Sequence, residues 1–199
     1  MIKEKEDNPL KILIQDEMTH LSQKENTVFL GENVINSGRI YGTLNFVDLK
    51  KCIEMPVAEN LITGTAIGLS LEGFVPICIF QRMDFMLIAS DAIINHACLL
   101  PKMTGGKVKC GVIFRTIQAG PINMRFYVGH QHSKDLGFIF EPFMKIIRIP
   151  ELPPKVAYKK AYTLASQGKP VLVVEDYESF NKPLSIGRKM TNGHKRTKG

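Results

Sequence analysis

Residues 58–80, AENLITGTAIGLSLEGFVPICIF, decide the fold class of this 199-residue chain. Residues 58–73 have the apolar spacing of a helix and end in glycine, and residues 74–80 form an apolar strand. A strand that is apolar on both faces is typical of a parallel sheet covered by helices on both sides. Gly64 and Gly68 lie four residues apart in the helix. Because glycine costs helix stability, we expect a bare helix face to be needed there.

The rest of the chain continues this alternation. The patterns predict helices at 9–22, 84–100, 133–143 and 155–167, strands at 27–32, 52–56, 109–116, 144–150 and 170–176, and loops at 33–50 and 117–133. The predicted fold is therefore α/β, with a doubly wound, mostly parallel sheet. We divide the chain into an N-terminal helical segment, an α/β domain and a basic tail, at residues 1–25, 26–180 and 181–199.

The composition excludes several classes of protein. With 44% hydrophobic, 23% charged and 8% aromatic residues, the chain is globular, not disordered, collagen-like or a coiled coil. No apolar run approaches the ~18 residues that span a bilayer, and the charged start MIKEKEDN is not expected to be a secretory signal. We therefore expect no membrane association and a location in the cytoplasm, or in a mitochondrial or other organellar matrix. The four cysteines are widely spaced, which favours buried free thiols over a zinc site.

The net charge of +7 comes mostly from the end of the chain. Residues 187–199, GRKMTNGHKRTKG, hold five lysines and arginines and no acid. Such a tail can contact nucleic acid or an acidic partner, but it is more often a solvated end. We therefore do not expect nucleic-acid binding.

Polar side chains follow several predicted strands, and in doubly wound folds ligands bind at that edge of the sheet. The candidates are Glu59 after the second strand, then Gln81, Arg82 and Asp84, and then Gln118, His130, Gln131, His132 and Ser133. A carboxylate at Glu59, in the apolar context PVAENL, would have a raised pKa that suits proton transfer. The alternative is that Glu59 is only an acid at the start of a helix, where the helix dipole favours a negative charge. The GHQHS histidines would need a third ligand to bind a metal. The chain has no phosphate-binding glycine loop and no GxSxG motif.

Four segments, in order, resemble the beta subunits of the 2-oxoacid dehydrogenase decarboxylase component, of the pyruvate and branched-chain types. They are PVAENLITGTAIGLSLEGFVPICIFQRMDFMLIASDAIINHA (56–97), GGKVKCGVIFRT (105–116, with Arg115 at the family's arginine), GHQHSKD (129–135) and GKPVLVVED (168–176). The resemblance implies the transketolase-like pyrimidine-binding domain of thiamine-diphosphate enzymes. It also implies cleavage of a carbon–carbon bond next to the carbonyl of a 2-oxo acid or a ketose.

The resemblance also implies roles for four residues. Glu59 would hydrogen-bond a ring nitrogen of the cofactor's aminopyrimidine and so promote proton removal from the cofactor. Phe85 would lie against this ring, or be a plain core residue, and Gln81 would lie near the same ring. His132 would reach the substrate, to bind a carboxylate or carry a proton.

Other features of the sequence bear on partners and activity. The family's second domain and its GDG…N metal motif are absent from this sequence. We therefore expect thiamine diphosphate and Mg²⁺ to be shared with an alpha-like partner subunit, in a heterotetramer, with Gly64 and Gly68 either at a subunit interface or packed inside the domain. Ile79 replaces a family acid, and residues 166–169, SQGK, replace an acidic potassium-binding loop. The alternatives are a non-catalytic structural or regulatory homologue, or the small subunit of a transketolase-like ketol transferase.

Overall fold

A computed structural model gives the fold of the chain and describes residues 9–36, 38–119 and 129–176. Its centre is a six-stranded sheet in the order β2-β1-β3-β4-β6-β5, and every neighbouring pair of strands is parallel. The strands are β1 (Thr27–Gly31), β2 (Cys52–Glu54), β3 (Val75–Phe80), β4 (Ile113–Gln118), β5 (Lys145–Ile149) and β6 (Val171–Asp176). The predicted parallel sheet is confirmed. The predicted tail, residues 181–199, and its boundary with the domain lie outside the described residues.

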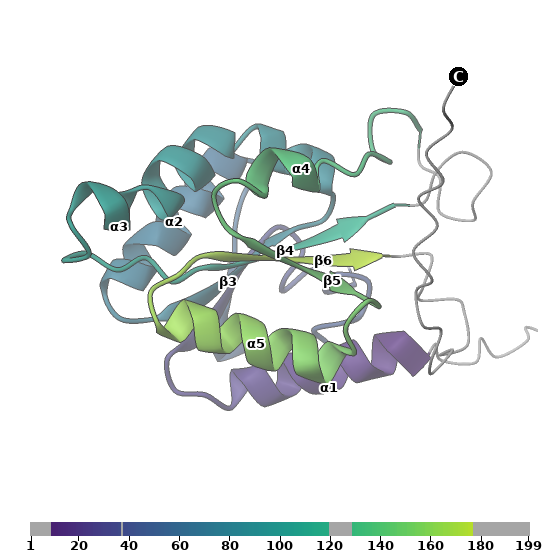
Figure 1. The fold of residues 1–199 in the computed structure, drawn as a ribbon. Coiled ribbons are helices and arrows are strands. Elements are labelled where there is room, and N and C mark those ends of the chain that lie inside the picture. Colours follow the sequence, from purple (N-terminus) through teal and green to yellow (C-terminus); the bar gives the residue numbers. More distant parts are fainter. Residues whose placement is uncertain (1–8, 37, 120–128, 177–199) are drawn as a thin grey trace, which may run out of the picture.

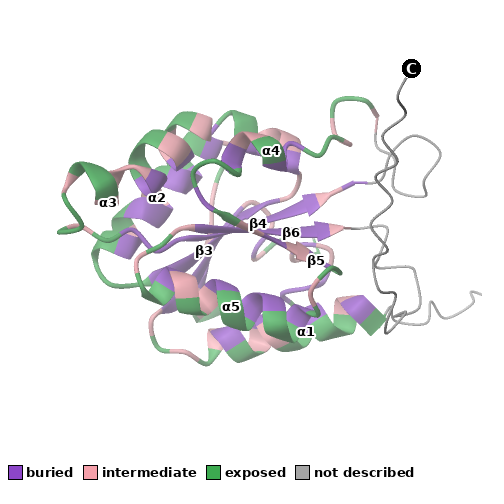
Figure 2. Ribbon diagram, in the orientation of Figure 1, coloured by how far each residue is buried: buried purple, intermediate pink, exposed green. Residues whose placement is uncertain are grey.

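Helices cover both faces of the sheet, as Figure 1 shows. On one face lie α1 (Pro9–Ser22) and α5 (Pro154–Ser166), and on the other lie α2 (Glu59–Leu71), α3 (Leu100–Met103) and α4 (Gly137–Phe140). Figure 2 shows the central strands buried and the helices exposed on their outer sides, while the edge strands β2 and β5 are only partly buried. The sheet therefore separates two apolar cores, one beneath each helical layer.

The periodicity of α1 explains its place in the fold. Leu10, Ile14, Met18 and Leu21 recur at helical spacing, and all four are buried against the sheet and α5. The helix thus packs on the same core as the strands that follow it.

The predicted helix at 84–100 has a different form in the structure. A 3₁₀ turn, η2 (Met83–Leu87), and a π-helix, η3 (Ala92–Cys98), precede α3, so the segment does not stop before Pro101. Proline is tolerated in the first turn of a helix, because a backbone N–H at that position makes no hydrogen bond within the helix. Pro101 therefore lies inside the first turn of α3 instead of ending a helix.

Two further boundaries of the prediction are wrong. Strand β4 begins at Ile113 and not at 109: the N–H of Gly111 donates to Ser70 Oγ at 2.7 Å and not to a neighbouring strand, and a Cβ there would lie 1.8 Å from the carbonyl oxygen of Ala165. The helix predicted at 133–143 is the single turn α4, since the backbone N–H of Leu136 donates to Met83 Sδ and not to a helical carbonyl.

The cysteines agree with the sequence prediction. All four are free and buried. Burial raises the pKa of Cys98 to about 12 and that of Cys110 to about 11, so both remain protonated thiols at neutral pH. None of the helices in the described ranges has the length and apolar character needed to span a bilayer.

Candidate functional site

The strand order places a ligand-binding crevice between β1 and β3. Strand β2 lies on one side of β1 and β3 on the other, so the connections leave in opposite directions and a crevice opens at the carboxyl ends. Glu32 directly follows β1, and Gln81 directly follows β3. Gly31 and Ile79 are register partners at this edge, so the two side chains emerge next to each other.

These side chains line a small pocket, which we call the glutamate pocket. Its lining residues are Glu32, Glu59, Ile62, Ile79, Phe80, Gln81 and Phe85. Three of the four residues that the sequence analysis singled out for the cofactor and the substrate therefore come together, from α2, η2 and the end of β3. Two carboxylates share the pocket with two isoleucines, two phenylalanines and the amide of Gln81.

Glu59 is the first residue of α2 and is only 6% exposed. Its carboxylate has no hydrogen-bond partner among the residues that the structure describes. The helix dipole favours a negative charge at this end of α2, while Ile62 and Ile79 provide apolar surroundings. A buried carboxylate of this kind is available to a ligand that brings its own donor or acceptor.

Glu32 is a site residue that the sequence analysis did not single out. Burial raises the pKa of its carboxyl, and the charges of Glu59 and Glu54 raise it further. The side-chain amide of Gln81 donates to Glu32 Oε2 at 3.4 Å. In the sequence, Glu32 is the last position of the predicted strand 27–32, whereas the candidate residues lie at positions after a strand.

His132 lies next to the glutamate pocket through its contact with Phe85. The two rings meet edge to face, with centroids 5.3 Å apart and planes inclined at 74°. His132 Nδ1 and Ser133 Oγ are buried and have no hydrogen-bond partner among the described residues. The segment behind them is held to the sheet by an ion pair between Asp135 and Arg148 at 3.0 Å. The imidazole thus contacts Phe85 and has a ring nitrogen that no described group binds.

The other candidate residues lie outside this pocket. Asp84, Gln118, His130 and Gln131 are described by the structure, but none of them is among the residues that line it. The two histidines lie in an irregular segment between β4 and α4. Over the described ranges, no group of three or more His, Cys, Asp or Glu side chains is placed to hold a metal ion.

A buried ion pair fixes the sheet edge beside the site. Arg115 of β4 donates to both carboxylate oxygens of Glu175 of β6, at 2.9 Å each, and both side chains are fully buried. Tyr158 of α5 donates to the same carboxylate, and Thr43 Oγ1 accepts from Arg115 at 2.8 Å. Burial alone would lower the pKa of Arg115, but the Glu175 carboxylate outweighs it and raises that pKa. Through Thr43, this network ties the loop between β1 and β2 to the sheet.

The fold and the site define a ligand-binding domain of the doubly wound class, with a buried carboxylate and an aromatic ring at its switch point. Residues 11–133 match the family described as transketolase, pyrimidine binding domain, and the chain belongs to this family.

Two proteins with sequences similar to this chain are named as beta subunits of the pyruvate dehydrogenase E1 component. It is 32% identical over 119 residues to the mitochondrial pyruvate dehydrogenase E1 component subunit beta of Saccharomyces cerevisiae, covering 58% of this chain and 31% of that protein. It is 30% identical over 141 residues to the pyruvate dehydrogenase E1 component subunit beta of Rickettsia bellii, covering 67% of this chain and 42% of that protein. The chain thus spans less than half the length of these two relatives.

The fold also matches solved structures. One is a split gene transketolase, an inactive beta4 tetramer, with a TM-score of 0.63 and 19% identity over 82% of this chain and 49% of that one. Another is a thiamin diphosphate-dependent enzyme from Mycobacterium smegmatis, described as putative, with a TM-score of 0.56 and 13% identity over 95% and 34%. At these identities the likeness concerns the fold alone.

Proposed function

We propose that this chain is the beta-type subunit of a split thiamine-diphosphate-dependent enzyme that decarboxylates a 2-oxo acid, as in the dehydrogenase component. The observation that carries the proposal is Glu59, a buried carboxylate with no hydrogen-bond partner among the described residues, in one pocket with Gln81 and Phe85. The family and the names of the relatives support it. We place the enzyme in the cytoplasm or in an organellar matrix.

The side chains of the glutamate pocket match the chemistry of an aminopyrimidine ring, which would lie across the mouth of the pocket, because the pocket itself has a volume of only about 10 Å³. Such a ring is flat, has apolar faces and carries ring nitrogens that bond to an acid, and the pocket offers an aromatic side chain, aliphatic walls and an acid. When bound, thiamine diphosphate supplies the carbon nucleophile for cleavage of a bond next to a carbonyl. Glu59 would hold a proton between its carboxylate and the ring nitrogen. Phe85 and Gln81 would orient the ring, and Ile62 and Ile79 would keep water from it.

His132 completes the proposed catalytic group. Its ring lies against Phe85, and its Nδ1 has no partner in the described part of the chain, so it can take a proton or bind a carboxylate that approaches from the side of the ring. We assign it to the substrate, and Glu59 to the cofactor.

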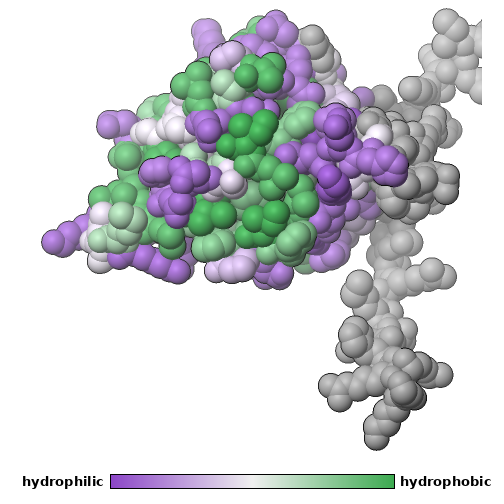
Figure 3. All heavy atoms as spheres, turned by 90° about the horizontal axis from the view of Figure 1, so that it is seen from above, coloured by the Kyte–Doolittle hydropathy of each residue, from purple (hydrophilic) through white to green (hydrophobic). Residues whose placement is uncertain are grey.

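The face of α2 supports the proposed need for a partner. Gly64 and Gly68 are exposed, and a Cβ added to either would meet nothing within 4 Å, so neither is required for packing inside the described domain. Leu61 and Leu71, on the same stripe, are about half exposed. Figure 3 shows hydrophobic side chains gathered on this side of the molecule. We propose that an alpha-like subunit, which holds the diphosphate and Mg²⁺, covers this face in a heterotetramer.

The test begins with a native pull-down that uses the full chain as bait and identifies co-purifying proteins by mass. We expect a partner with a GDG…N motif. In the reconstituted complex, Glu59→Gln should lower the turnover of 2-oxo acids by about 10²–10⁴-fold, the usual contribution of a proton-transferring group. Glu25→Gln, the same change at an exposed position between α1 and β1, is the matched control and should leave turnover unchanged. Unchanged turnover in Glu59→Gln would contradict the assignment.

The same experiment separates the alternatives. Ile79 lines the glutamate pocket at the position where the family has an acid, which favours a non-catalytic structural or regulatory homologue. A chain that purifies only as a homo-oligomer and binds no thiamine diphosphate would support that function. Turnover of ketoses without turnover of 2-oxo acids would instead identify a ketol transferase.

A further inference from the structure

A groove of about 560 Å³ lies between α1 and α5, on the side of the sheet opposite α2. We call it the helix groove. One wall comes from α1 and the turn after it, and the other comes from α5. The residues of the first wall are Asp16, Glu17, His20, Leu21 and Lys24, and those of the second are Lys155, Lys159, Tyr162 and Thr163. No described residue lines both this groove and the glutamate pocket, so the two sites are separate.

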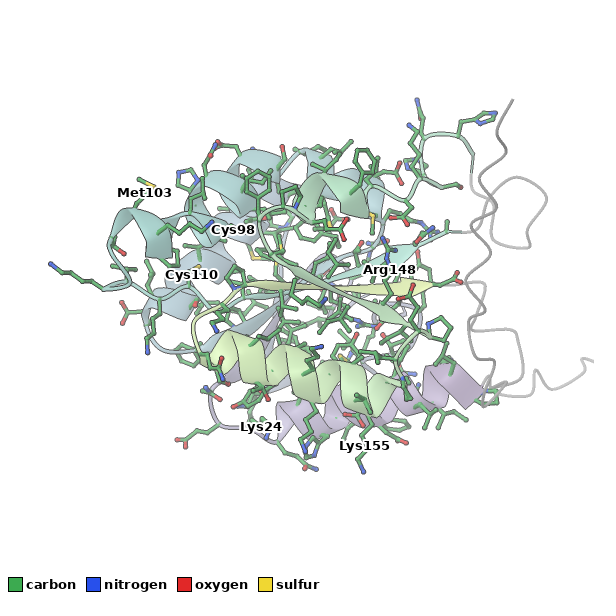
Figure 4. All side chains as sticks on the ribbon, viewed as in Figure 1. Lys24, Cys98, Met103, Cys110, Arg148 and Lys155 are labelled. Carbon is green, nitrogen blue, oxygen red and sulfur yellow. The ribbon has the colours of Figure 1, made fainter. Side chains whose placement is uncertain are left out.

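Two contacts show that the walls of the helix groove run in the same direction. The charge of Lys155 acts on the Glu17 carboxyl, whose pKa it lowers. Lys24 Nζ lies 4.7 Å from the ring centroid of Tyr162. The chain advances by the same number of residues between these two contacts on either wall, so α1 and α5 run parallel. Figure 4 shows Lys24 and Lys155 apart from each other along the outer side of this helical layer.

The charges that face each other across the helix groove are of opposite sign, and they do not pair. The α1 wall carries the carboxylates of Asp16 and Glu17, and the α5 wall carries the ammonium groups of Lys155 and Lys159. None of these four side chains forms an ion pair or a hydrogen bond with another described residue. The groove therefore holds the two kinds of charge apart, with room for a ligand between them.

The carboxylate of Glu17 is partly shielded from water. Burial raises its pKa, and this effect outweighs the charges of His20 and Lys155, which lower that pKa. The lining of the groove also includes Leu21, whose side chain is buried and apolar. Contacts between charges are stronger in such surroundings than on an open surface, because less water screens them.

The charges of the helix groove indicate which kind of ligand fits it. Among the described residues, three lysines and two acids line the groove, which leaves one positive charge in excess when His20 is neutral. A ligand with one ammonium group and two carboxylates carries the complementary charges. Its ammonium group would lie on the acids of α1, and its carboxylates would lie on the lysines.

We propose that the helix groove binds an acidic amino acid, aspartate or glutamate. The walls supply both kinds of partner that such a molecule needs, since carboxylates accept from its ammonium group and lysines donate to its carboxylates. The proposed ligand is neither the cofactor nor the 2-oxo acid. The inference goes beyond the proposed function and does not depend on it.

The test is isothermal titration calorimetry on the full chain alone, with L-aspartate and, separately, with L-glutamate. We expect saturable binding of at least one of them. Succinate and glutarate lack the ammonium group, and β-alanine and 4-aminobutyrate lack the α-carboxylate. Each should bind about tenfold or more weakly than the amino acid of the same length, the loss that one charged contact commonly brings.

Variants of the two walls locate the binding. Glu17→Gln should weaken the binding of the amino acid about tenfold and leave that of the dicarboxylate unchanged, because only the ammonium group contacts this wall. Lys159→Met should weaken both. Lys107→Met is the matched control, since Lys107 is an exposed lysine just after α3 and does not line the groove, so binding should be unchanged.

Each outcome decides for or against the site. Absence of saturable binding of both amino acids overturns the proposal, and so do dicarboxylates that bind as tightly as the amino acids. Binding that survives both Glu17→Gln and Lys159→Met, in variants with normal circular dichroism, overturns it as well. The assay contains neither thiamine diphosphate nor a partner, so failure here is distinct from failure of the proposed function.

Discussion

The buried ion pair between Arg115 and Glu175 gives the sharpest prediction about stability. Arg115→Met keeps much of the side-chain volume but leaves the Glu175 carboxylate fully buried, with Tyr158 as its remaining donor. Breaking one partner of a buried pair costs about 3–5 kcal/mol, a large part of the ~5–15 kcal/mol by which domains are stable. With a urea m-value of about 2 kcal/mol/M, the unfolding midpoint should fall by about 2 M.

A double variant shows whether the cost is electrostatic. Arg115→Met with Glu175→Gln removes both charges and keeps an amide oxygen that accepts from Tyr158, so most of the lost stability should return. The assay is urea unfolding of the wild type, the two single variants and the double variant, followed by circular dichroism. A loss below about 1 kcal/mol in Arg115→Met, or a double variant as unstable as the sum of the singles, would refute this reasoning.

Three further changes test other parts of the structure. Gly64→Ala should raise the free energy of unfolding of the isolated chain by about 0.5–1 kcal/mol, since the position is helical and open; destabilisation in urea would contradict the geometry of α2. Gly111→Ala should destabilise the fold by about 3 kcal/mol or more, because the new Cβ would lie 1.8 Å from the carbonyl oxygen of Ala165. A thermal melting temperature equal to that of the wild type would disprove that contact. Glu32→Gln should stabilise the chain at neutral pH. Burial and the charge of Glu59 raise the pKa of the Glu32 carboxyl in the folded state, so its ionisation lowers the stability of the wild type as the pH rises above 4.5. The thermal melts of variant and wild type should therefore converge below that pH.

Periodicity in the sequence predicted most of the elements. The helix at 9–22 has its predicted bounds, and strands β3, β5 and β6 lie within the predicted segments. These elements can be predicted from the local sequence, because the spacing of their apolar residues shows which face of each element is buried. The segments that were placed wrongly depend on distant contacts. Strand β4 starts late because Gly111 meets α5 and Ser70, residues far away in the sequence.

The site was predicted only in part, for a similar reason. The resemblance singled out Glu59, Gln81 and Phe85, and the structure brings these three into one pocket. Glu32 enters the same pocket because β1 and β3 are neighbours, a fact that no local pattern contains.

The sequence by itself determined the fold class, the alternation of elements, and the family to which this chain is similar, because these rest on the spacing and order of residues along the chain. The tertiary structure alone decided the pairing of Arg115 with Glu175, the bare face of α2 and the contact of Gln81 with Glu32. Each of these joins residues from separate elements, and their approach is set by how the strands order in the sheet and how the helices cover it.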